Sequence, residues 1–253
     1  IREGDIFQVN LSQRFSSTAP VDPVTFYLEL RQRSPAPFGA FFRGSSCTIA
    51  SSSPERFVQV DRDRRVESRP IKGTRRRSTD RVQDMELSSA LVSSDKDRAE
   101  NLMIADLLRN DISRISRAGT VRAAELFRLE SFATVHHLVS IIEGRLRNGI
   151  GPVDVIRAMF PCGSVTGAPK IRAMEIIAEL ESVARGPCYR SVGWIGLDGQ
   201  MDLSVAIRTA VITRERAAFH SGGAVVSDSH PEDEFAETLD KARALAATLS
   251  YEI

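Results

Sequence analysis

The chain has 253 residues, of which 42% are hydrophobic and 26% are charged, and its formal net charge is +1. This length can bury a sizeable core in one large domain or in two small ones. A charge balance so near neutral argues against a dedicated nucleic-acid-binding protein, which normally shows a basic excess. No apolar run reaches the length that spans a bilayer and no signal peptide is visible, so we expect no membrane association.

The three cysteines, Cys47, Cys162 and Cys188, lie far apart and form no C-x-x-C pair. Neither a zinc site nor a disulfide framework is therefore expected, and a reducing, cytoplasmic compartment fits this cysteine usage best. The chain opens at Ile1 without a methionine. We therefore expect either a processed N-terminus or a longer parent chain, of which this would be the C-terminal part.

The first expected strand alternates apolar and polar side chains from Phe7 to Ser12. On such a strand Gln8, Asn10 and Ser12 share one face. If that face lines a cavity, these are hydrogen-bonding groups held on a rigid element; if it meets water, they are solvated side chains without a role.

A short helix is expected over residues 22–33, because Asp22-Pro23 suits a first helical turn. Residues 38–68 then predict an antiparallel meander, since short apolar runs alternate with turns rich in Gly, Ser and Asp. Its expected strands are 38–42, 47–50, 56–60 and 65–68.

Lys72 stands out because the chain has thirty arginines and only four lysines. Arginine stays protonated in proteins, whereas a desolvated lysine can lose its proton and become a nucleophile or a base. Lys72, between Pro70-Ile71 and Gly73-Thr74, is either such a group or a solvated lysine in a strand-to-turn loop. Glu55, at a neighbouring expected strand end, is predicted within its reach, as a surface ion pair or as an acid/base partner.

The clearest helix is expected from Lys96 to about Ser113, capped by Asp95 or Asp97. Glu100 would lie along its polar edge.

His136 and His137 follow in the segment 129–140. Adjacent residues point to opposite faces of a strand and about 100° apart on a helix, so we expect only one of them to serve a site. Their spacing does not match a helical metal-binding pair.

The loop Cys162 to Lys170 is rich in Gly, Ser and Thr and leads into a helix expected from Ile171 to about Arg185. Backbone N–H groups and the positive dipole end make such a loop a candidate anion site. It is not a Walker A loop, because Ala-Pro separates Gly167 from Lys170. A carboxylate ligand is therefore at least as well supported as a phosphate.

Strands are expected again from residue 191, with a hairpin turn at Asp198-Gly199. Arg208 falls in an otherwise apolar strand, where a guanidinium needs a carboxylate partner from the protein or from a ligand. Ser221-Gly222-Gly223 predicts the start of a strand that a ligand or another backbone approaches closely.

The last helix is expected over residues 232–249, with a core stripe of Phe235, Leu239 and Ala242. On a neighbouring stripe stand Glu234, Glu237 and Lys241. This stripe is either a salt-bridged solvent face or a pair of carboxylates aimed at a divalent cation. Mg²⁺ is typically held by one or two protein carboxylates together with water and substrate oxygens.

Seven motifs occur along the chain in the order found in the chorismate-utilising enzymes, and the resemblance covers essentially all 253 residues. The motifs are GDIFQVNLSQRF (4–15), SPERF (53–57), PIKGT (70–74), DRAENLMI (97–104), VHHLVS (135–140), GSVTGAPK (163–170) and EFAET (234–238).

Two positions indicate a branch of that family. Anthranilate synthases usually have alanine where Lys72 stands, and isochorismate and salicylate synthases usually have lysine where Gln8 stands. On both counts the chain resembles the 4-aminating branch, the aminodeoxychorismate synthases.

The resemblance implies an α+β fold with two large, mostly antiparallel β-sheets packed as a sandwich and helices outside. It implies a single chorismate-binding catalytic domain over residues 1–253. The implied activity is amination of chorismate at C4 to 4-amino-4-deoxychorismate, for para-aminobenzoate and folate biosynthesis, with ammonia from a glutamine amidotransferase subunit.

By the same resemblance, Lys72 would attack C2 as the 4-hydroxyl leaves, and ammonia would then attack C4 and displace the lysine. Glu55 would be the general acid/base. Glu100 and Glu237 would hold Mg²⁺ against the ring carboxylate, supported by Glu234 and Asp97. The other implied pocket residues are Arg208 and Tyr189 at the enolpyruvyl carboxylate, with Gly223, Ala224, Lys241, His137, Thr166, Gln8 and Thr74 lining the site.

Two alternatives stand beside this reading. One is an anthranilate synthase-like enzyme that aminates C2. The other, from a different class, is a non-catalytic chorismate-binding or complex-forming subunit. The presence of Glu55, Lys72, Glu100 and Glu237 argues against a non-catalytic chain.

Overall fold

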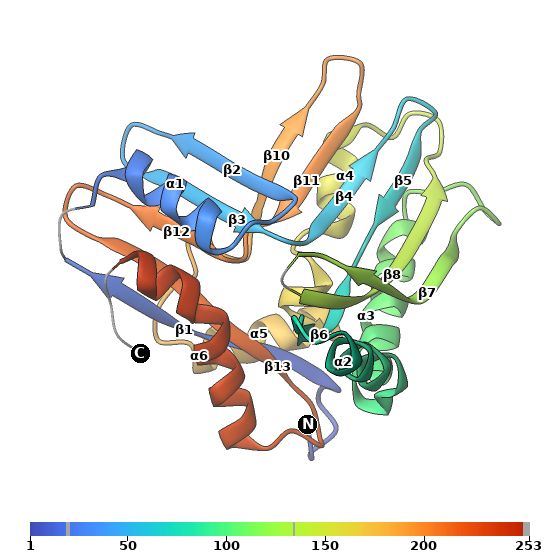
Figure 1. Cartoon of the computed structure of the whole chain (residues 1–253). Coiled ribbons are helices and arrows are strands. Elements are labelled where there is room, and N and C mark those ends of the chain that lie inside the picture. The colour runs from blue at the N-terminus through green and yellow to red at the C-terminus, as the bar shows by residue number, and fades with distance from the viewer. Residues whose placement is uncertain (19–20, 134, 250–253) are drawn as a thin grey trace. The chain divides into compact units, whose positions relative to one another are not determined.

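A computed structural model of the chain describes residues 1–18, 21–133 and 135–249. Within those residues it has six α-helices and thirteen β-strands, which form two antiparallel sheets (Figure 1). The predicted α+β class with two antiparallel sheets is confirmed; the packing of the sheets as a sandwich stays a prediction.

The chain divides into two compact units. The first comprises Ile1–Glu55, Val165–Trp194 and Leu203–Ile253, and the second comprises Arg56–Ser164 and Ile195–Asp202. Neither unit is one continuous stretch of chain. The expectation of a single catalytic domain over residues 1–253 stays a prediction.

The first unit is built on a six-stranded sheet with the order β2-β3-β12-β13-β1-β9. Its strands are β1 (Gln8–Ser17), β2 (Phe38–Arg43), β3 (Thr48–Ser53), β9 (Gly167–Ala168), β12 (Thr209–Ile212) and β13 (Ala217–Val225). β1 lies between β13 and β9, so Gln8 is opposite Ala168 on one side and Val9 is opposite Val225 on the other. This pairing brings residues 166–168 alongside the first strand.

Three helices belong to the first unit: α1 (Pro23–Arg33), α5 (Lys170–Leu180) and α6 (Pro231–Thr248). Figure 1 shows α1 and α6 side by side on the sheet, where Leu30 and Leu245 pack with Phe219 in one core. α5 packs on β1, with Ala173 and Ile177 buried beside Val9.

The second unit carries β4 (Arg56–Val60), β5 (Arg65–Ser68), β6 (Ile71–Arg76), β7 (Arg122–Ser131) and β8 (Val135–Arg145). The second sheet has the order β10-β11-β4-β5-β8-β6, with β7 paired to β8. The hairpin β10 (Ser191–Ile195) and β11 (Met201–Val205) is crossed by the division between the units.

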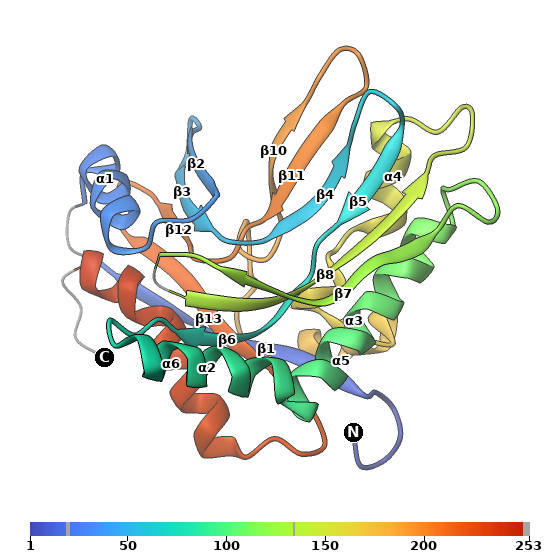
Figure 2. The same ribbon diagram turned by 45° about the vertical axis from the view of Figure 1, so that its right-hand side comes forward.

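The helices of the second unit are α2 (Arg81–Ser93), α3 (Asp95–Ser113) and α4 (Pro152–Met159). Figure 2 shows α2 and α3 along one side of the β6–β8–β7 strands. Ile104, Leu108 and Ile112 of α3 are fully buried, as is Leu138 of β8. Among the described residues, no helix combines the length and the apolar character that crossing a membrane requires.

Several predicted elements are confirmed. α1 begins at Pro23, because the Asp22 side chain accepts the N–H of Thr25 at 2.8 Å. The expected strands of residues 38–68 all form, but they are not one meander. β2 and β3 belong to the first sheet and β4 and β5 to the second, because the chain changes sheets between Ser53 and Arg56.

Other predictions were wrong in detail. The cap of α3 is Ser94, whose hydroxyl accepts the N–H of Asp97 at 3.2 Å; neither Asp95 nor Asp97 is the cap. α5 ends at Leu180, so residues 181–185 lie outside it. On α6 the core stripe does not include Phe235, which is 54% exposed; the buried residues are Thr238, Ala242, Leu245 and Ala246.

Candidate functional site

The candidate site residues fall into two sets, one in each unit. The first unit holds Gln8, Glu55, Thr166, Tyr189, Arg208, Gly223, Ala224, Glu234, Glu237 and Lys241. The second unit holds Lys72, Thr74, Asp97, Glu100 and His137. Because Glu55 and Lys72 belong to different units, the expected reach between them stays a prediction.

Lys72 lies in a β-bulge of β6. Ile71 is opposite Val139 of β8 and Thr74 is opposite His137, so Lys72 and Gly73 together face the single residue Leu138. A bulge bends its strand and re-aims a side chain, and bulges are frequent next to active sites. The half-buried Lys72 is therefore held in an irregular backbone on a packed sheet and not in a free loop.

Gly73 explains why this bulge is compact. Its φ is +81°, a conformation that side-chain-bearing residues rarely adopt. A Cβ at this position would lie 2.8 Å from Leu91 Cδ1 and 3.0 Å from the side chain of Asp97. The backbone beside Lys72 thus approaches both α2 and α3, and the approach needs glycine.

The two adjacent histidines have separate partners, as expected for a strand. His137 Nδ1 lies 2.9 Å from the Thr74 hydroxyl, which joins two candidate residues across β6 and β8. His136 lies 2.8 Å from the Ser131 hydroxyl and 3.1 Å from Asp84 Oδ1. His136 is thus part of the internal bonding of the second unit, and His137 is the one left for the candidate site.

Asp97 and Glu100 occupy the first two turns of α3. Asp97 accepts a hydrogen bond from Arg75 at 2.8 Å and is mostly buried. Glu100 is half-buried on the same helix. Both carboxylates are therefore placed by a helix whose apolar face is locked against β8.

Polar side chains of β1 are buried without protein partners. Gln8 is fully buried, and neither its amide nitrogen nor its amide oxygen has a hydrogen-bond partner among the described residues. The same holds for Asn10 Oδ1 on the same face of the strand. A buried amide without partners costs free energy, which a polar ligand would recover.

The backbone next to these amides is closely packed. Asn10 donates its backbone N–H to Thr166 O at 2.7 Å, and Thr166 is buried. A Cβ on Gly167 would lie 2.2 Å from Gln8 O, so only glycine allows residues 166–168 to approach β1 so closely. The predicted anion loop therefore consists of a 3-10 turn, η1 (Gly163–Val165), and the two-residue strand β9 beside β1, and its capacity to bind an anion stays a prediction.

Gly223 and Ala224 lie on β13, opposite Leu11 and Asn10 of β1. A Cβ on Gly223 would meet Glu234 Oε2 at 3.1 Å and Lys241 Nζ at 3.9 Å. These glycine contacts bring the carboxylate and the amine of α6 onto the sheet backbone. The sequence prediction of a close approach at the glycines is thus confirmed, although they lie inside β13 and do not start it.

On α6, Lys241 donates to Gly222 O at 3.2 Å and forms an ion pair with Glu237 at 2.5 Å. Glu234 accepts from the Ser229 hydroxyl at 2.6 Å. Glu234 and Lys241 lie next to β13. The side chains of Glu237 and Lys241 are 53% and 41% exposed, so this part of the stripe is a salt-bridged surface.

Arg208 lies between β11 and β12, not within a strand, and its φ is +47°. Its backbone carbonyl accepts the N–H of Ser52 at 3.0 Å, and this hydrogen bond holds the left-handed backbone of Arg208 in place. Burial lowers the pKa of the half-buried guanidinium, and within the described parts of the chain no carboxylate forms an ion pair with it. A guanidinium desolvated in this way attracts an anion.

Tyr189 is buried, and its φ is +61°. Burial raises the pKa of its hydroxyl well above the ordinary value, and the nearby Arg185 opposes that shift only in part. Its N–H donates to Ala206 O at 2.9 Å, two residues before Arg208. Tyr189 and Arg208 are thus linked through the backbone.

Glu55 closes the first segment of the first unit, just after β3, and is 4% exposed. Its N–H donates to the Ser53 hydroxyl at 3.3 Å, and its carbonyl accepts the N–H of Val205 at 3.0 Å. A buried carboxyl on a fixed backbone is held in one place, as a group that transfers a proton must be.

The carboxylates fit Mg²⁺ by chemistry. Asp97 and Glu100 on α3, and Glu234 and Glu237 on α6, supply the oxygen ligands that Mg²⁺ prefers. In residues 1–18, 21–133 and 135–249, no three His, Cys, Asp or Glu side chains gather as a ready metal-binding group.

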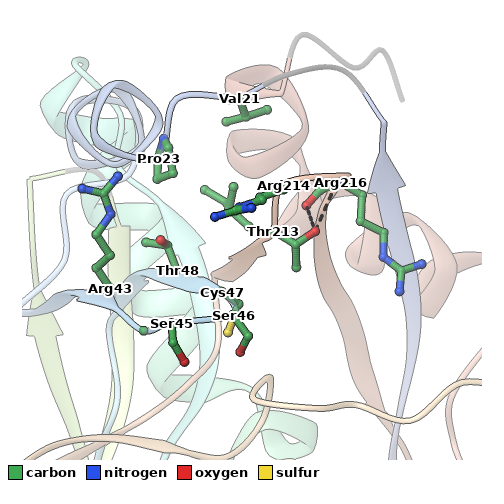
Figure 3. A pocket seen from close by; sticks show the side chains of 12 residues that line it. Val21, Pro23, Arg43, Ser45, Ser46, Cys47, Thr48, Thr213, Arg214 and Arg216 are labelled. Carbon is green, nitrogen blue, oxygen red and sulfur yellow. Dashed lines mark hydrogen bonds between the residues drawn. The ribbon is translucent and has the colours of Figure 1, made fainter.

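A pocket of about 380 Å³ lies elsewhere in the first unit and includes none of the candidate residues. It is lined by the turn after β2 and the turn after β12, with Cys47 and three arginines, Arg43, Arg214 and Arg216. Figure 3 shows the Arg214 guanidinium extending toward the middle of the lining residues, whereas Arg216 points away from them. No carboxylate is among the described lining residues.

Comparison with known proteins decides the family. The family described as chorismate binding enzyme matches residues 1–247. The chain belongs to that family. The resemblance carried by the seven sequence motifs is thereby confirmed.

Two curated relatives and one solved structure show which members of the family the chain is similar to. Aminodeoxychorismate synthase component 1 of Escherichia coli (strain K12) is 47% identical over 241 residues, 95% of this chain and 53% of that protein. Anthranilate synthase component 1 of Aquifex aeolicus is 45% identical over 246 residues, 97% of this chain and 49% of that protein. The crystal structure of anthranilate synthase component I from Streptococcus pneumoniae has a TM-score of 0.88 and 38% identity, covering 97% of this chain and 54% of that one.

The chain therefore spans about half the length of these relatives. Identities of 47% and 45% to the two kinds of synthase are too similar to decide between their reactions.

Sequence reasoning missed one group beside these candidates. Glu181 and Arg185 form a mostly buried ion pair at 2.6 Å, next to Asn10, Val165 and Tyr189. An acid and a base four residues apart were a visible signal, but that spacing is also typical of exposed helical pairs.

Proposed function

We propose that this chain aminates chorismate at C4, forming 4-amino-4-deoxychorismate, the precursor of para-aminobenzoate. The observation that carries the substrate class is the half-buried Arg208 guanidinium, which no carboxylate of the described chain neutralises. Chorismate brings two carboxylates, and its enolpyruvyl carboxylate would pair with Arg208 beside Tyr189. The buried Gln8 amide supports a polar ligand as well.

Lys72 carries the choice of C4. In the proposed reaction its amine forms a bond to C2 while both conjugated ring double bonds shift, from C1=C2 to C1=C6 and from C5=C6 to C4=C5, and the C4–oxygen bond breaks. Glu55 donates the proton with which the 4-hydroxyl leaves as water. Ammonia then bonds to C4, both double bonds shift back, and the C2–nitrogen bond breaks to release Lys72.

The remaining candidates bind and orient. Gly223, Ala224 and Lys241 of the first unit, with Gln8 and Thr166, would contact the substrate. Thr74 and His137 of the second unit form a hydrogen-bonded pair that would line the same substrate.

Mg²⁺ would neutralise the ring carboxylate when bound. We propose Glu100 and Glu237 as its protein ligands, with Glu234 and Asp97 in support. Lys241 pairs with Glu237 at 2.5 Å, and this ion pair would orient that carboxylate.

The ammonia donor is proposed from the relatives. The protein of Escherichia coli is named a component 1, and a second component would be a glutamine amidotransferase subunit that delivers ammonia. Ammonium salt should replace that subunit in vitro, because free ammonia is the nucleophile of the proposed second step.

The test incubates the chain with chorismate, Mg²⁺ and ammonium salt and identifies the product by mass and absorbance. The expected product is 4-amino-4-deoxychorismate, and omission of Mg²⁺ should abolish it. Lys72→Ala should remove both the product and any covalent adduct trapped on the chain, whereas Lys96→Ala, an exposed lysine on α3, should retain both. Anthranilate as the main product would reject the C4 assignment.

Anthranilate formation is the second candidate function. It is favoured by the 45% identity to the anthranilate synthase component 1 of Aquifex aeolicus. The same assay separates the two, because anthranilate is aromatic and fluorescent while 4-amino-4-deoxychorismate keeps the enolpyruvyl group.

A further inference from the structure

We propose that Glu181 and Arg185 are a positioning pair that fixes three substrate-contacting segments of the first unit with respect to one another. The segments are β1 at Gln8 and Asn10, the chain at Thr166 just before β9, and the turn at Tyr189. This inference rests on the proposed function, because it assigns the three segments to one substrate.

The pair is a bidentate ion pair of low exposure. Arg185 Nε donates to Glu181 Oε2 at 2.8 Å and Arg185 Nη2 donates to Glu181 Oε1 at 2.6 Å. Their side chains are 11% and 8% exposed. A planar guanidinium fork matched to a carboxylate in this way has one preferred geometry, which a flexible surface pair lacks.

The guanidinium also bridges two backbone segments. Arg185 Nη1 donates to Val165 O at 2.8 Å, and Nη2 donates to Asn10 O at 2.6 Å. Val165 precedes Thr166, whose own carbonyl accepts the N–H of Asn10. One side chain thus joins β1 to the segment that precedes β9. In the described parts of the chain, the Gln8 amide and Asn10 Oδ1 are buried there without a hydrogen-bond partner.

The third segment is held through an aromatic ring. The Arg185 guanidinium carbon lies 4.7 Å from the centroid of the Tyr189 ring, a cation–π distance. Tyr189 has the left-handed backbone that turns the chain toward Ala206 and Arg208. Arg185 therefore contacts Tyr189, the proposed neighbour of Arg208 at the substrate carboxylate.

Glu181 orients Arg185 from the other side. Its Oε1 accepts both the backbone N–H and the hydroxyl of Ser12, at 2.8 Å and 2.9 Å. Ser12 lies on the same face of β1 as Gln8 and Asn10, so the carboxylate is anchored to the strand that it helps to position. Burial alone would raise the pKa of Glu181, but the hydrogen bonds from Arg185 and Ser12 outweigh it and hold that pKa below its ordinary value.

This arrangement also explains why α5 ends early. The helix stops at Leu180, and the extended backbone of Glu181 (φ −83°, ψ 112°) takes the chain off the helix axis. A continued helix would present Glu181 and Arg185 as an ordinary pair along one helical face. The break places both side chains against β1 instead.

The test uses Arg185→Lys, which keeps the positive charge but cannot reproduce four hydrogen bonds from a planar fork. We expect the KM for chorismate, and its dissociation constant by calorimetry, to rise about tenfold with a smaller change in kcat, because binding segments shift while the nucleophile does not. Amide hydrogen exchange at Asn10 should accelerate, since its bond to Thr166 O loses its support.

The matched control is Arg172→Lys on α5. Arg172 is 39% exposed and pairs with Asp5 and Glu175 at the surface, so its replacement should change neither KM nor the exchange of Asn10. If Arg185→Lys fails to fold, Ser12→Ala keeps both charges and removes one hydrogen bond to Glu181. That variant should raise KM about two- to threefold.

The outcomes separate two failures. A lower melting temperature with unchanged chorismate affinity, in Arg185→Lys or in Ser12→Ala, would overturn the positioning role and leave a purely stabilising ion pair. Chorismate binding by the wild type without aminated product would reject the proposed reaction, while the dissociation constants still test the pair. Absence of chorismate binding by the wild type would overturn both.

Discussion

At the scale of single residues, Gly222 shows how closely two strands approach in the first unit. A Cβ at this position would lie 1.9 Å from Leu11 O and 2.7 Å from Ser12 Cα, both backbone atoms of β1. Backbone cannot move aside as the end of a side chain can. The same separation of β1 and β13 sets the position of Gly223, which Glu234 and Lys241 approach.

Gly222→Ala should therefore destabilise the fold by about 3 kcal/mol or more, at or above the upper end of ordinary overpacking. The measurement is denaturant unfolding followed by circular dichroism. Gly119→Ala is the control, because Gly119 has φ +74° but nothing within 4 Å of the added Cβ. Its cost should be about 1–2 kcal/mol, from left-handed backbone strain alone. Equal costs for the two variants would show that β1 gives way.

The three cysteines differ in the chemistry open to them. Burial raises the pKa of the Cys188 thiol to about 11, and Cys188 is 3% exposed. Cys162 is equally buried, whereas Cys47 is half-buried in the pocket that Arg43 and Arg214 line. Thiolate, and not thiol, is the form that reacts with alkylating reagents.

Alkylation of the folded chain at pH 8 should therefore modify Cys47 first. Iodoacetate should be favoured over iodoacetamide there, relative to a free thiol, because the arginine-lined pocket attracts an anion, and added salt should reduce that preference. Peptide mass spectrometry gives the site and the rate. Early modification of Cys188 would contradict the burial of its side chain.

At the scale of the element, α3 decides where two candidate magnesium ligands lie. The Ser94 hydroxyl accepts the N–H of Asp97, so this cap fixes the first turn that carries Asp97 and precedes Glu100. Acidic residues in that turn also complement the positive end of the helix dipole.

Ser94→Ala should lower the free energy of unfolding by about 1 kcal/mol, the typical cost of a lost N-cap. Thermal and urea unfolding measure this loss. Ser88→Ala in α2 is the matched control, since the Ser88 hydroxyl only contacts Met85 O within its own helix. A null result for Ser94→Ala would mean that Asp95 or Asp97 replaces the cap, as sequence reasoning first suggests.

Elements defined by local pattern were predictable from the sequence. The alternation of residues 7–12 gave β1, Asp22-Pro23 gave the start of α1, and the apolar stripe after Lys96 gave α3. The helix α2 was not predicted, because its Ser-rich C-terminal part, residues 88–94, resembles a loop in sequence. The division of residues 38–68 between two sheets could not be predicted, since hydrogen-bond partners such as β12 for β3 lie far along the chain.

The candidate site could also be predicted only in part. The residue types at Lys72, Glu55 and Arg208 indicated what chemistry each could perform, and only a family resemblance supplied the substrate. Glu181 and Arg185 were missed because their partners Ser12, Asn10 and Val165 come from three-dimensional packing. Nothing in a local pattern distinguishes such a pair from a solvated one.

At the scale of the whole molecule, the carboxylates and the histidine whose pKa values are lowered all change stability in one direction as pH falls. Asp22, Asp84 and Asp198 have pKa values lowered by hydrogen bonds, and Glu181 has a lowered pKa despite its burial. Burial also lowers the pKa of His220, although Glu181 opposes this and Arg185 and Arg14 reinforce it. In every case the folded chain binds fewer protons than the unfolded chain, so stability falls as pH falls.

His220 is the first of these groups to reduce stability as pH falls from neutral. Its unfolded pKa is near the model-compound value of 6.5, and its folded pKa is lower. Stability contributed by the neutral imidazole is thus complete above pH 6.5 and is lost as pH falls toward the folded pKa. The paired carboxylates add a second loss below their unfolded values of 3.8 and 4.5.

Melting temperature should therefore decrease from pH 7.5 to pH 5, and His220→Gln should flatten that decrease, because glutamine does not titrate. The ring of His220 packs edge-on against the ring of Tyr189, with their centroids 6.3 Å apart, and its Nδ1 lies 3.4 Å from the Ser12 hydroxyl. Because His220→Gln removes these contacts, the variant should be less stable than the wild type at every pH. The slope between pH 7.5 and pH 5 is the diagnostic quantity, and His230→Gln, at an exposed position before α6, is the control. An unchanged slope in His220→Gln would place the neutral-pH loss of stability elsewhere in the chain.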